Sequence, residues 1–324
     1  MVHAIRIHEY GGPDVLRWEE VAVGAPGAGE VRLRQKALGL NYIDTYHRTG
    51  LYPLAALPAV IGMEGAGEVI AVGAGVDEFT VGDRVAYANP IGAYAEERLI
   101  PAERLVKLPS SISFENAAAM MLQGMTVQYL LRRTYKVGPQ TVMLLHAAAG
   151  GVGLIACQWA RHLGATIIGT VGSEEKAMLA KAAGCTHVIN YRSEDFVARV
   201  REITSGAGCD VVYDAIGKDT YPGSLDCLKP LGLWVSYGNA SGKIEGFDLS
   251  ILAAKGSLFA TRPTLFTYVA KRADLVASAG ELFDMVGRGI VKINVNQTYP
   301  LREAARAHRD LEDRKTTGST VLLP

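Results

Sequence analysis

The sequence carries no surplus of either charge. Lys and Arg total 33 and Asp and Glu total 33 over 324 residues, so the formal net charge is zero. A neutral chain gives no electrostatic reason to expect nucleic acid or an anionic membrane as the main partner, and no basic, aromatic-rich stripe suggests an RNA surface. We therefore expect neither nucleic acid nor a membrane among its partners.

Cysteine is scarce and scattered. The four cysteines form no CxxC pair, and the seven histidines show no HxxxH or HxH spacing. These absences argue against a metal site of the usual spacing. Cys157, Cys185, Cys209 and Cys227 lie within or beside apolar stretches and are expected to be buried thiols. Residues 1–10 lack the apolar core of a signal peptide, so a reducing, cytoplasmic location is the default expectation.

A glycine turn between apolar runs is the strongest local motif. The run at 141–146 predicts a buried parallel strand, residues 154–163 have a helical pattern, and the run at 166–171 predicts a second strand. The turn resembles a dinucleotide-binding fingerprint in which Ala148 replaces the first glycine. A turn of this kind lets the backbone approach a pyrophosphate and the helix pack closely on the strand. Its residues are Gly150, Gly151, Val152 and Gly153.

Simpler interpretations of this stretch stay open. It could be a tight turn with no ligand, or the nearly uncharged residues 141–160 could span a membrane. The glycines, the polar His146 and the change from strand to helix pattern argue against a span. His146 itself, at the end of a buried strand, is more simply a structural histidine than a catalytic one.

The end of the second strand bears on cofactor choice. NAD sites place an Asp or Glu there to bind the ribose 2′-hydroxyl, whereas this strand ends in Gly172 and Ser173, with Lys176 following. A hydroxyl and a cation suit a 2′-phosphate, so the sequence favours NADPH over NADH. Glu174 and Glu175 are contrary evidence, unless they form the acidic first turn of a helix, which the helix dipole favours.

The elements change in character along the chain. Residues 1–118 are rich in short strands, predicted at 4–8, 30–38, 67–72, 84–88 and 95–100, and a helix is predicted at 113–131. Strands and helices then alternate up to a sixth strand at 257–261, including a helix at 221–228, as in a doubly wound parallel sheet. The tail shows helix 268–288, strand 292–299, helix 301–313 and strand 320–323. We expect an α/β chain of two domains, one from residues 1–118 and 265–324, the other from 119–264.

Separate motifs, in order along the chain, carry a resemblance to a known superfamily. Residues 39–46, 50–53 and 62–67 resemble the medium-chain dehydrogenases/reductases. Five further segments resemble the zinc-free branch of this superfamily, the zeta-crystallin-like quinone oxidoreductases. They are residues 82–85, 146–153, 190–192, 236–239 and 318–319. Within that branch, the chain most resembles the bacterial NADPH:quinone reductases. The resemblance implies a Rossmann NADPH-binding domain and a GroES-like catalytic domain. It also implies reduction of small quinones in the cleft between them, and a homodimer formed through residues 257–261.

The resemblance also shows which metal ligands are missing. Zinc alcohol dehydrogenases carry a cysteine ligand where this chain has Asn41 and a histidine where it has Met63. An amide and a thioether are poor zinc ligands, so we predict no metal. Quinone carbonyls are already electrophilic and need no Lewis acid. Whether the electrons move as a hydride or singly stays open.

Catalytic and cofactor residues are implied by the same resemblance. Asn41 would donate its amide N–H to a quinone oxygen, and Tyr46 and Tyr52 would stack on the ring or donate a hydrogen bond. The simpler alternatives are that Asn41 caps a turn and Tyr46 only packs. The catalytic set is Asn41, Asp44, Tyr46 and Tyr52. Besides the glycine turn, the cofactor set is Tyr42, Ile43, Thr126, Tyr129, Gly172, Ser173, Lys176, Tyr191, Ile216, Tyr237, Gly238, Asn239, Phe259, Thr261 and Arg314.

Three other functions compete with quinone reduction. An enone or alkenal double-bond reductase would use the same NADPH and a similar cleft. A zinc alcohol dehydrogenase is disfavoured by Asn41 and Met63. A non-catalytic, crystallin-like protein that binds NADPH or RNA belongs to a different class, and the neutral charge weighs against the RNA.

Overall fold

The computed structural model describes residues 1–324 and divides them into two compact units. Unit 1 comprises Met1–Met125, Val269–Gly287 and Ile293–Pro324, and unit 2 comprises Thr126–Tyr268 and Arg288–Lys292. Unit 1 continues beyond residue 118 because the next turn of the chain bonds within it: the backbone N–H of Leu122 donates to Glu64.

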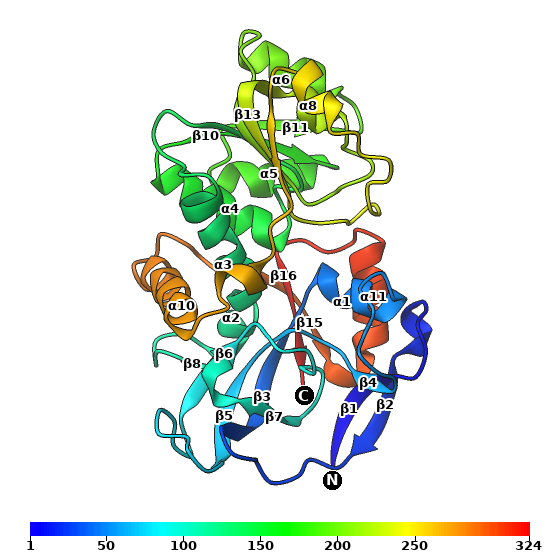
Figure 1. The fold of residues 1–324 in the computed structure, drawn as a ribbon, viewed down its shortest axis with the longest axis vertical. Coiled ribbons are helices and arrows are strands. Elements are labelled where there is room, and N and C mark those ends of the chain that lie inside the picture. The colour runs from blue at the N-terminus through cyan, green and yellow to red at the C-terminus, as the bar shows by residue number, and fades with distance from the viewer. The chain divides into compact units, whose positions relative to one another are not determined.

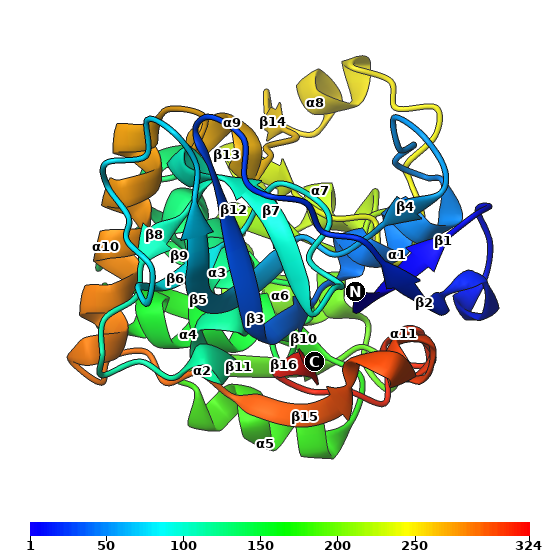
Figure 2. The same cartoon turned by 90° about the horizontal axis from the view of Figure 1, so that it is seen from below.

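Unit 1 is built on two β-sheets, drawn in Figure 1 and from another side in Figure 2. The smaller sheet has the order β2-β1-β4, and the seven-stranded sheet has the order β15-β16-β3-β5-β6-β8 with β7 also paired to β3. The strands of the smaller sheet are β1 (Val2–Ile7), β2 (Arg17–Val21) and β4 (Ala59–Val60). Those of the larger are β3 (Glu30–Leu40), β5 (Glu64–Val72), β6 (Arg84–Tyr87), β7 (Glu97–Pro101), β8 (Val106–Lys107), β15 (Val295–Pro300) and β16 (Ser319–Leu323).

The long strand β3 organises the core of unit 1. Its early side chains alternate, with Val31 and Leu33 buried, as expected for a strand with one face in a core. The last strand, β16, pairs antiparallel with β3, so that Val321 lies opposite Gly39. The two ends of the chain therefore build one sheet.

The helices within residues 42–134 and 265–312 correct several predictions, and the helical residues 126–134 and 265–268 belong to unit 2. Helix α1 (Tyr42–Thr49) was not predicted. The helix predicted at 113–131 consists of α2 (Phe114–Ala118), α3 (Met121–Tyr129) and a π-helical turn at Leu130–Thr134. The helix predicted at 268–288 is broken into α9 (Leu265–Tyr268) and α10 (Arg272–Gly287), and the one predicted at 301–313 begins with a 3₁₀ turn before α11 (Ala304–Glu312).

Unit 2 confirms the predicted doubly wound sheet. Its six strands have the order β11-β10-β9-β12-β13-β14 and pair in parallel throughout. They are β9 (Val142–Leu145), β10 (Thr166–Val171), β11 (His187–Asn190), β12 (Cys209–Asp214), β13 (Leu228–Ser236) and β14 (Phe259–Thr261). The helices are α4 (Gly151–His162), α5 (Glu174–Ala182), α6 (Phe196–Ile203), α7 (Gly223–Asp226) and α8 (Ser250–Ala254).

Helix α7 is much shorter than the predicted 221–228. Pro222 stands at its N-cap, and β13 already begins at Leu228. Proline is tolerated at a helix start but not inside, so the helix cannot extend backward through it. In the whole chain, no helix is long and apolar enough to cross a membrane.

Candidate active site

The glycine turn joins the end of β9 to α4 in unit 2. Gly150 caps α4, and the first turn of the helix carries no acidic side chain. A Cβ on Gly153 would lie 2.3 Å from the carbonyl oxygen of Ala147, so only glycine allows this close approach. The first N–H groups of a helix have no intrahelical partners and attract phosphate. The turn therefore fits the pyrophosphate of a dinucleotide.

The predicted 2′-phosphate residues gather at the end of β10. The Ser173 hydroxyl accepts a hydrogen bond from the backbone N–H of Lys176 at 3.2 Å and so caps α5. A Cβ on Gly172 would lie 2.6 Å from the Tyr191 hydroxyl, which places this tyrosine over the glycine. Glu174 and Glu175 lie in the first turn of α5, as the structural interpretation of these residues predicted. Glu174 also accepts a hydrogen bond from the Asn190 amide at 3.2 Å.

Further cofactor candidates lie where β12 and β13 end. A Cβ on Gly238 would lie 2.3 Å from the carbonyl oxygen of Ala215. The backbone N–H of Ser241 donates to Ile216 at 2.9 Å. The segment Tyr237, Gly238 and Asn239 is thus held against the end of β12. The carboxyl ends of parallel strands form the usual ligand-binding edge of an open sheet, and the glycine turn lies at the same edge.

The remaining cofactor candidates are more scattered. Thr261 pairs with Val235 near the carboxyl end of β13, but Phe259 pairs with Leu233 at the start of β14 and is 60% exposed. The structure therefore does not bring Phe259 to the carboxyl edge. Tyr129 is buried and stacks on Tyr268 at 4.3 Å, and Thr126 lies one turn earlier on α3. Arg314 follows α11 in unit 1 with a left-handed φ of 60°.

The predicted quinone-side residues meet around α1 in unit 1. Asn41 caps this helix, and Tyr42, Ile43, Asp44 and Tyr46 lie on it. The rings of Tyr46 and Tyr52 meet edge to face at 5.2 Å, and the Tyr42 ring lies 6.3 Å from that of Tyr46. Residues from α1 and the following loop thus build one aromatic cluster.

Asn41 is held firmly by hydrogen bonds. Its Nδ2 donates to Glu64 Oε2 at 2.7 Å, and its Oδ1 accepts from Gln123 Nε2 at 3.1 Å. An amide nitrogen has two N–H bonds, so one donor is not used by Glu64. Asn41 therefore stands at the N-cap of α1, and its bond to Glu64 uses one of the two N–H bonds of its amide.

The two carboxyl groups beside Asn41 are fully buried. Burial raises the pKa of Asp44 to about 7, although hydrogen bonds from the Asn41 N–H and the Tyr94 hydroxyl oppose the rise. Burial likewise raises the pKa of Glu64 to about 8, opposed by the Asn41 amide and the Leu122 N–H. Asp44 is 0% exposed, so it can influence a substrate only through its neighbours.

His146 proves to be the structural residue that its position suggests. Its ring is buried, with Nδ1 3.0 Å from Thr170 Oγ1 and Nε2 3.0 Å from Ser224 Oγ. Burial lowers its pKa. These contacts tie β9 to β10 and α7 behind the glycine turn.

No group of three or more His, Cys, Asp or Glu side chains in the structure is arranged to hold a metal ion. At the two positions where zinc relatives carry ligands, Asn41 bonds to Glu64 and Gln123, and Met63 is buried. This donor set does not suit zinc.

Two known protein families match separate parts of this chain. Residues 27–110 match the family model described as the alcohol dehydrogenase GroES-like domain, and residues 151–272 match the model described as zinc-binding dehydrogenase. A GroES-like domain joined to a doubly wound dinucleotide-binding domain defines the class: a medium-chain dehydrogenase/reductase.

Individual relatives narrow the class. A quinone oxidoreductase from Pseudomonas aeruginosa is 55% identical over 325 residues and covers all of both chains. The crystal structure of the Escherichia coli quinone oxidoreductase complexed with NADPH superposes with a TM-score of 0.98 at 50% identity, covering 99% of this chain and 100% of that one. A 2-haloacrylate reductase from Burkholderia sp is 52% identical, covering 100% of this chain and 99% of its own. The chain belongs to the quinone oxidoreductase family.

Several residues of the site were missed from the sequence. Glu64 and Gln123 hold Asn41, and Tyr94 with His308 leads to Asp44. Glu64 could have been predicted as a site residue, because it directly follows Met63 at a position where zinc relatives carry a ligand. His308 could not, because it lies more than 260 residues from Asn41 in the chain.

Proposed function

We propose that this chain is an NADPH:quinone reductase that acts without a metal. The observation that carries the proposal is the state of Asn41. It occupies the position of a zinc ligand, but its amide is anchored by Glu64 and Gln123 with one N–H left over. That N–H can donate to a quinone oxygen, where negative charge develops during reduction.

The cofactor end supports NADPH. The turn Gly150–Gly153 and the start of α4 would hold the pyrophosphate. Ser173 and Lys176 would hold the 2′-phosphate, because the tip of β10 offers no acidic side chain for a ribose hydroxyl, and Tyr191 would lie near the adenosine end of the cofactor. When bound, NADPH supplies the two electrons that a quinone needs. The residues at the ends of β12 and β13, with Thr261, would hold the ribose and nicotinamide.

The quinone would bind against α1 and the loop that follows it. The edge-to-face pair Tyr46 and Tyr52 offers an aromatic surface for a planar ring. Asn41 fixes the orientation of the ring by its N–H. Asp44, which is wholly buried, would position α1 rather than touch the substrate.

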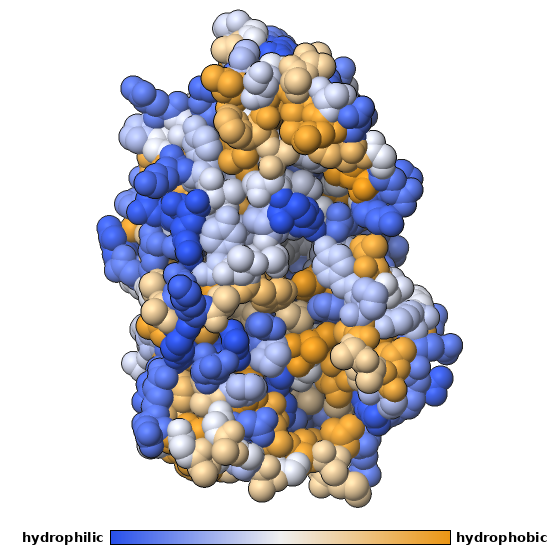
Figure 3. Space-filling model, viewed as in Figure 1, coloured by the Kyte–Doolittle hydropathy of each residue, from blue (hydrophilic) through white to orange (hydrophobic).

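We further propose a homodimer that works in the cytoplasm. Strand β14 is an edge strand with an exposed Phe259. The exposed apolar residues Leu231, Phe247 and Leu249 belong to the same part of unit 2, and Figure 3 shows apolar surface around α8 and β13. An exposed apolar edge favours pairing with a second copy. All four cysteines are free and buried, which suits a reducing compartment. Light scattering that gives the mass of one chain would refute the dimer.

A second candidate, reduction of an activated double bond, is supported by one observation. The 2-haloacrylate reductase from Burkholderia sp is 52% identical over the full chain. The same Asn41 N–H could polarise the carbonyl or carboxylate conjugated to the double bond. A substrate comparison separates the two candidates.

The test is NADPH oxidation with 1,4-benzoquinone, 9,10-phenanthrenequinone, a simple enone and 2-chloroacrylate, repeated with NADH. We expect fast turnover with a quinone and NADPH and slow turnover with NADH. Asn41→Ala should lower kcat for the quinone about a hundredfold. Asn116→Ala, in α2 of the same unit, is the matched control and should leave kcat unchanged.

Two results would contradict the proposal. Turnover only with the enone or the chloroacrylate would move the chain to the double-bond reductases. Equal turnover with NADH and NADPH would refute the role given to Ser173 and Lys176.

A further inference from the structure

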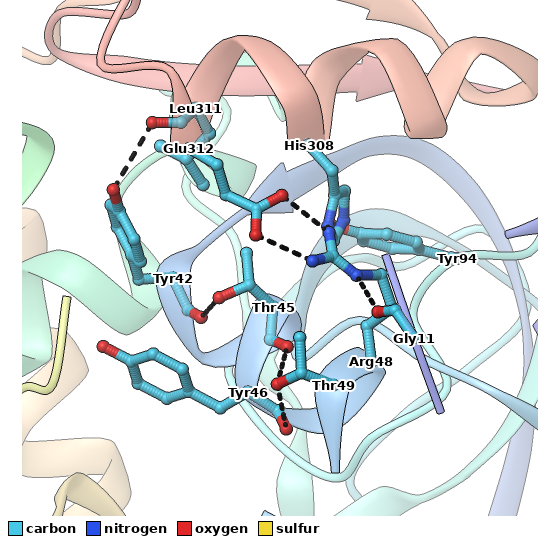
Figure 4. A network of polar contacts seen from close by, with 10 residues as sticks. All are labelled: Gly11, Tyr42, Thr45, Tyr46, Arg48, Thr49, Tyr94, His308, Leu311 and Glu312. Atoms are coloured by element: carbon cyan, nitrogen blue, oxygen red, sulfur yellow. Dashed lines mark hydrogen bonds and ion pairs between the residues drawn. The ribbon is translucent and has the colours of Figure 1, made fainter. Parts of the chain in front are cut away.

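A chain of buried polar side chains connects α11 to the start of α1 within unit 1. Arg48 and His308 are 1% and 0% exposed. Arg48 donates to both oxygens of Glu312 at 2.7 and 2.9 Å and, through Nη1, contacts His308 Nδ1 at 3.0 Å. Figure 4 shows Arg48 enclosed between Glu312, His308 and the backbone of Gly11.

The arginine determines which nitrogen of His308 carries hydrogen. A guanidinium group only donates hydrogen bonds, so Nδ1 of His308 must accept. Burial, followed by the charge of Arg48, lowers the pKa of His308 to about 3, and the ring is therefore neutral. A neutral ring with an accepting Nδ1 carries its single hydrogen on Nε2.

The direction of every further bond follows from this tautomer. His308 Nε2 lies 3.1 Å from the Tyr94 hydroxyl and donates to it. The hydroxyl hydrogen of Tyr94 then points to Asp44 Oδ2, 3.0 Å away. The same carboxyl oxygen accepts the backbone N–H of Asn41 at 2.9 Å. The donors thus run one way, from Arg48 through His308 and Tyr94 to Asp44.

The chain ends where α1 begins. Asp44 binds the N–H of Asn41 three residues earlier, an arrangement that caps the helix start. On the other side, the Tyr42 hydroxyl donates to the Leu311 carbonyl of α11 at 3.4 Å. Helix α11 therefore holds α1 through its first turn and through its last turn, where Arg48 lies.

We propose that His308 and Tyr94 are positioning residues for the quinone site: their one-way donor chain, set by Arg48, fixes Asp44 and with it the backbone of Asn41. The inference rests on the proposed function, because Asn41 is the donor to the quinone. Neither His308 nor Tyr94 touches the substrate. A displacement of a catalytic donor by about 1 Å can cost up to a hundredfold in rate, so loss of the chain should lower kcat.

The direct test compares two buried tyrosines of unit 1. Tyr94→Phe removes the donor to Asp44, whereas Tyr87→Phe removes a similar buried hydroxyl that donates to Gln35. We expect Tyr94→Phe to lower kcat for the quinone about tenfold, with the Kd for NADPH unchanged. Tyr87→Phe should keep the wild-type kcat. His308→Leu should reproduce the loss, and His308→Gln, whose amide keeps a donor and an acceptor, should restore most of the rate.

A second measurement needs neither turnover nor a substitution in Tyr94. Long-range proton–nitrogen spectra of histidine-labelled protein should show His308 neutral and protonated on Nε2 from pH 5 to pH 8, about two units or more above its pKa of about 3. His308→Gln assigns the signal. Hydrogen on Nδ1, or a charged ring, would overturn the proposal.

The failures of the two proposals are distinguishable. If wild-type protein does not reduce quinones with NADPH, the proposed function fails. If the wild-type protein is active and Tyr94→Phe turns over as fast as Tyr87→Phe, the positioning proposal alone fails.

Discussion

Each unit buries one aspartate completely, and the two aspartates differ in charge state. Asp44 in unit 1 and Asp214 in unit 2 are both 0% exposed. Burial raises the pKa of Asp44 to about 7. Burial also acts to raise the pKa of Asp214, but His146 and hydrogen bonds from Gly217, Ser224 and Thr220 outweigh it, and the pKa is lowered.

The neighbouring His146 and the number of hydrogen-bond donors explain the difference. Asp214 accepts from the backbone N–H groups of Ile216 and Gly217 and from the hydroxyls of Thr220 and Ser224 at 2.7 to 3.0 Å. Asp44 accepts on Oδ2, and its Oδ1 makes no hydrogen bond. Hydrogen bonds stabilise the ionised form, whereas depth alone destabilises it. The comparison teaches that the neighbouring charges and donors, not the depth of burial, decide whether a buried carboxyl is charged.

The largest expected effect comes from replacing each aspartate by asparagine. Asp214→Asn leaves several buried donors facing an amide nitrogen and should lower the free energy of unfolding by about 3 kcal/mol or more. Asp44→Asn at pH 7 should instead leave the free energy of unfolding unchanged or raise it by up to about 4 kcal/mol, because the neutral amide avoids the cost of keeping a carboxyl in this buried position. Urea unfolding of both variants measures the two changes. Equal losses would break the comparison.

The pH dependence of stability is expected to have opposite signs at the two residues. A raised pKa in the folded state means that the native protein binds the extra proton, so stability falls as pH rises from about 4 through about 7 at Asp44. This decline amounts to about 4 kcal/mol. Asp214, with a lowered pKa, contributes stability that is present above about pH 4 and is lost as pH falls further.

Unfolding of the wild-type and Asp44→Asn proteins between pH 4 and pH 9 checks these signs. The decline should shrink in the variant, and the part that continues toward pH 8 belongs to Glu64, whose pKa is about 8. A wild-type protein whose stability rises steadily from pH 4 to pH 7 would show that Asp44 is ionised in the folded state.

The cofactor end could be predicted from the sequence because its signals are local. The glycine turn, the two strands beside it and the polar tip of β10 are adjacent in the chain, and strand and helix periods can be recognised directly. The resemblance added the residues around Asn41. The structure places Asn41 at the N-cap of α1 and brings the rings of Tyr46 and Tyr52 into contact, whereas Phe259 lies away from the edge where the other strand ends meet.

Other features needed the three-dimensional structure. Helix α1 has only eight residues, too few for a helical period to stand out, although Asn41, Asp44 and Gly50 at its ends are ordinary cap signals. The contact between Arg48 and His308 joins residues 260 positions apart. No sequence period reports a bond of that kind.

The donor chemistry at Asn41 connects the site to the function. An amide and a thioether stand at the two positions where zinc relatives carry ligands, and the Asn41 amide is bonded to Glu64 and Gln123. We therefore expect electron transfer to a quinone to need no metal.

The measurement that tests this claim most directly is quinone reduction by NADPH before and after exhaustive dialysis against a chelator, with zinc in the protein determined by mass spectrometry. We predict zinc far below one ion per chain and an unchanged kcat after dialysis. Loss of turnover on dialysis and its recovery on adding Zn²⁺ would contradict the account.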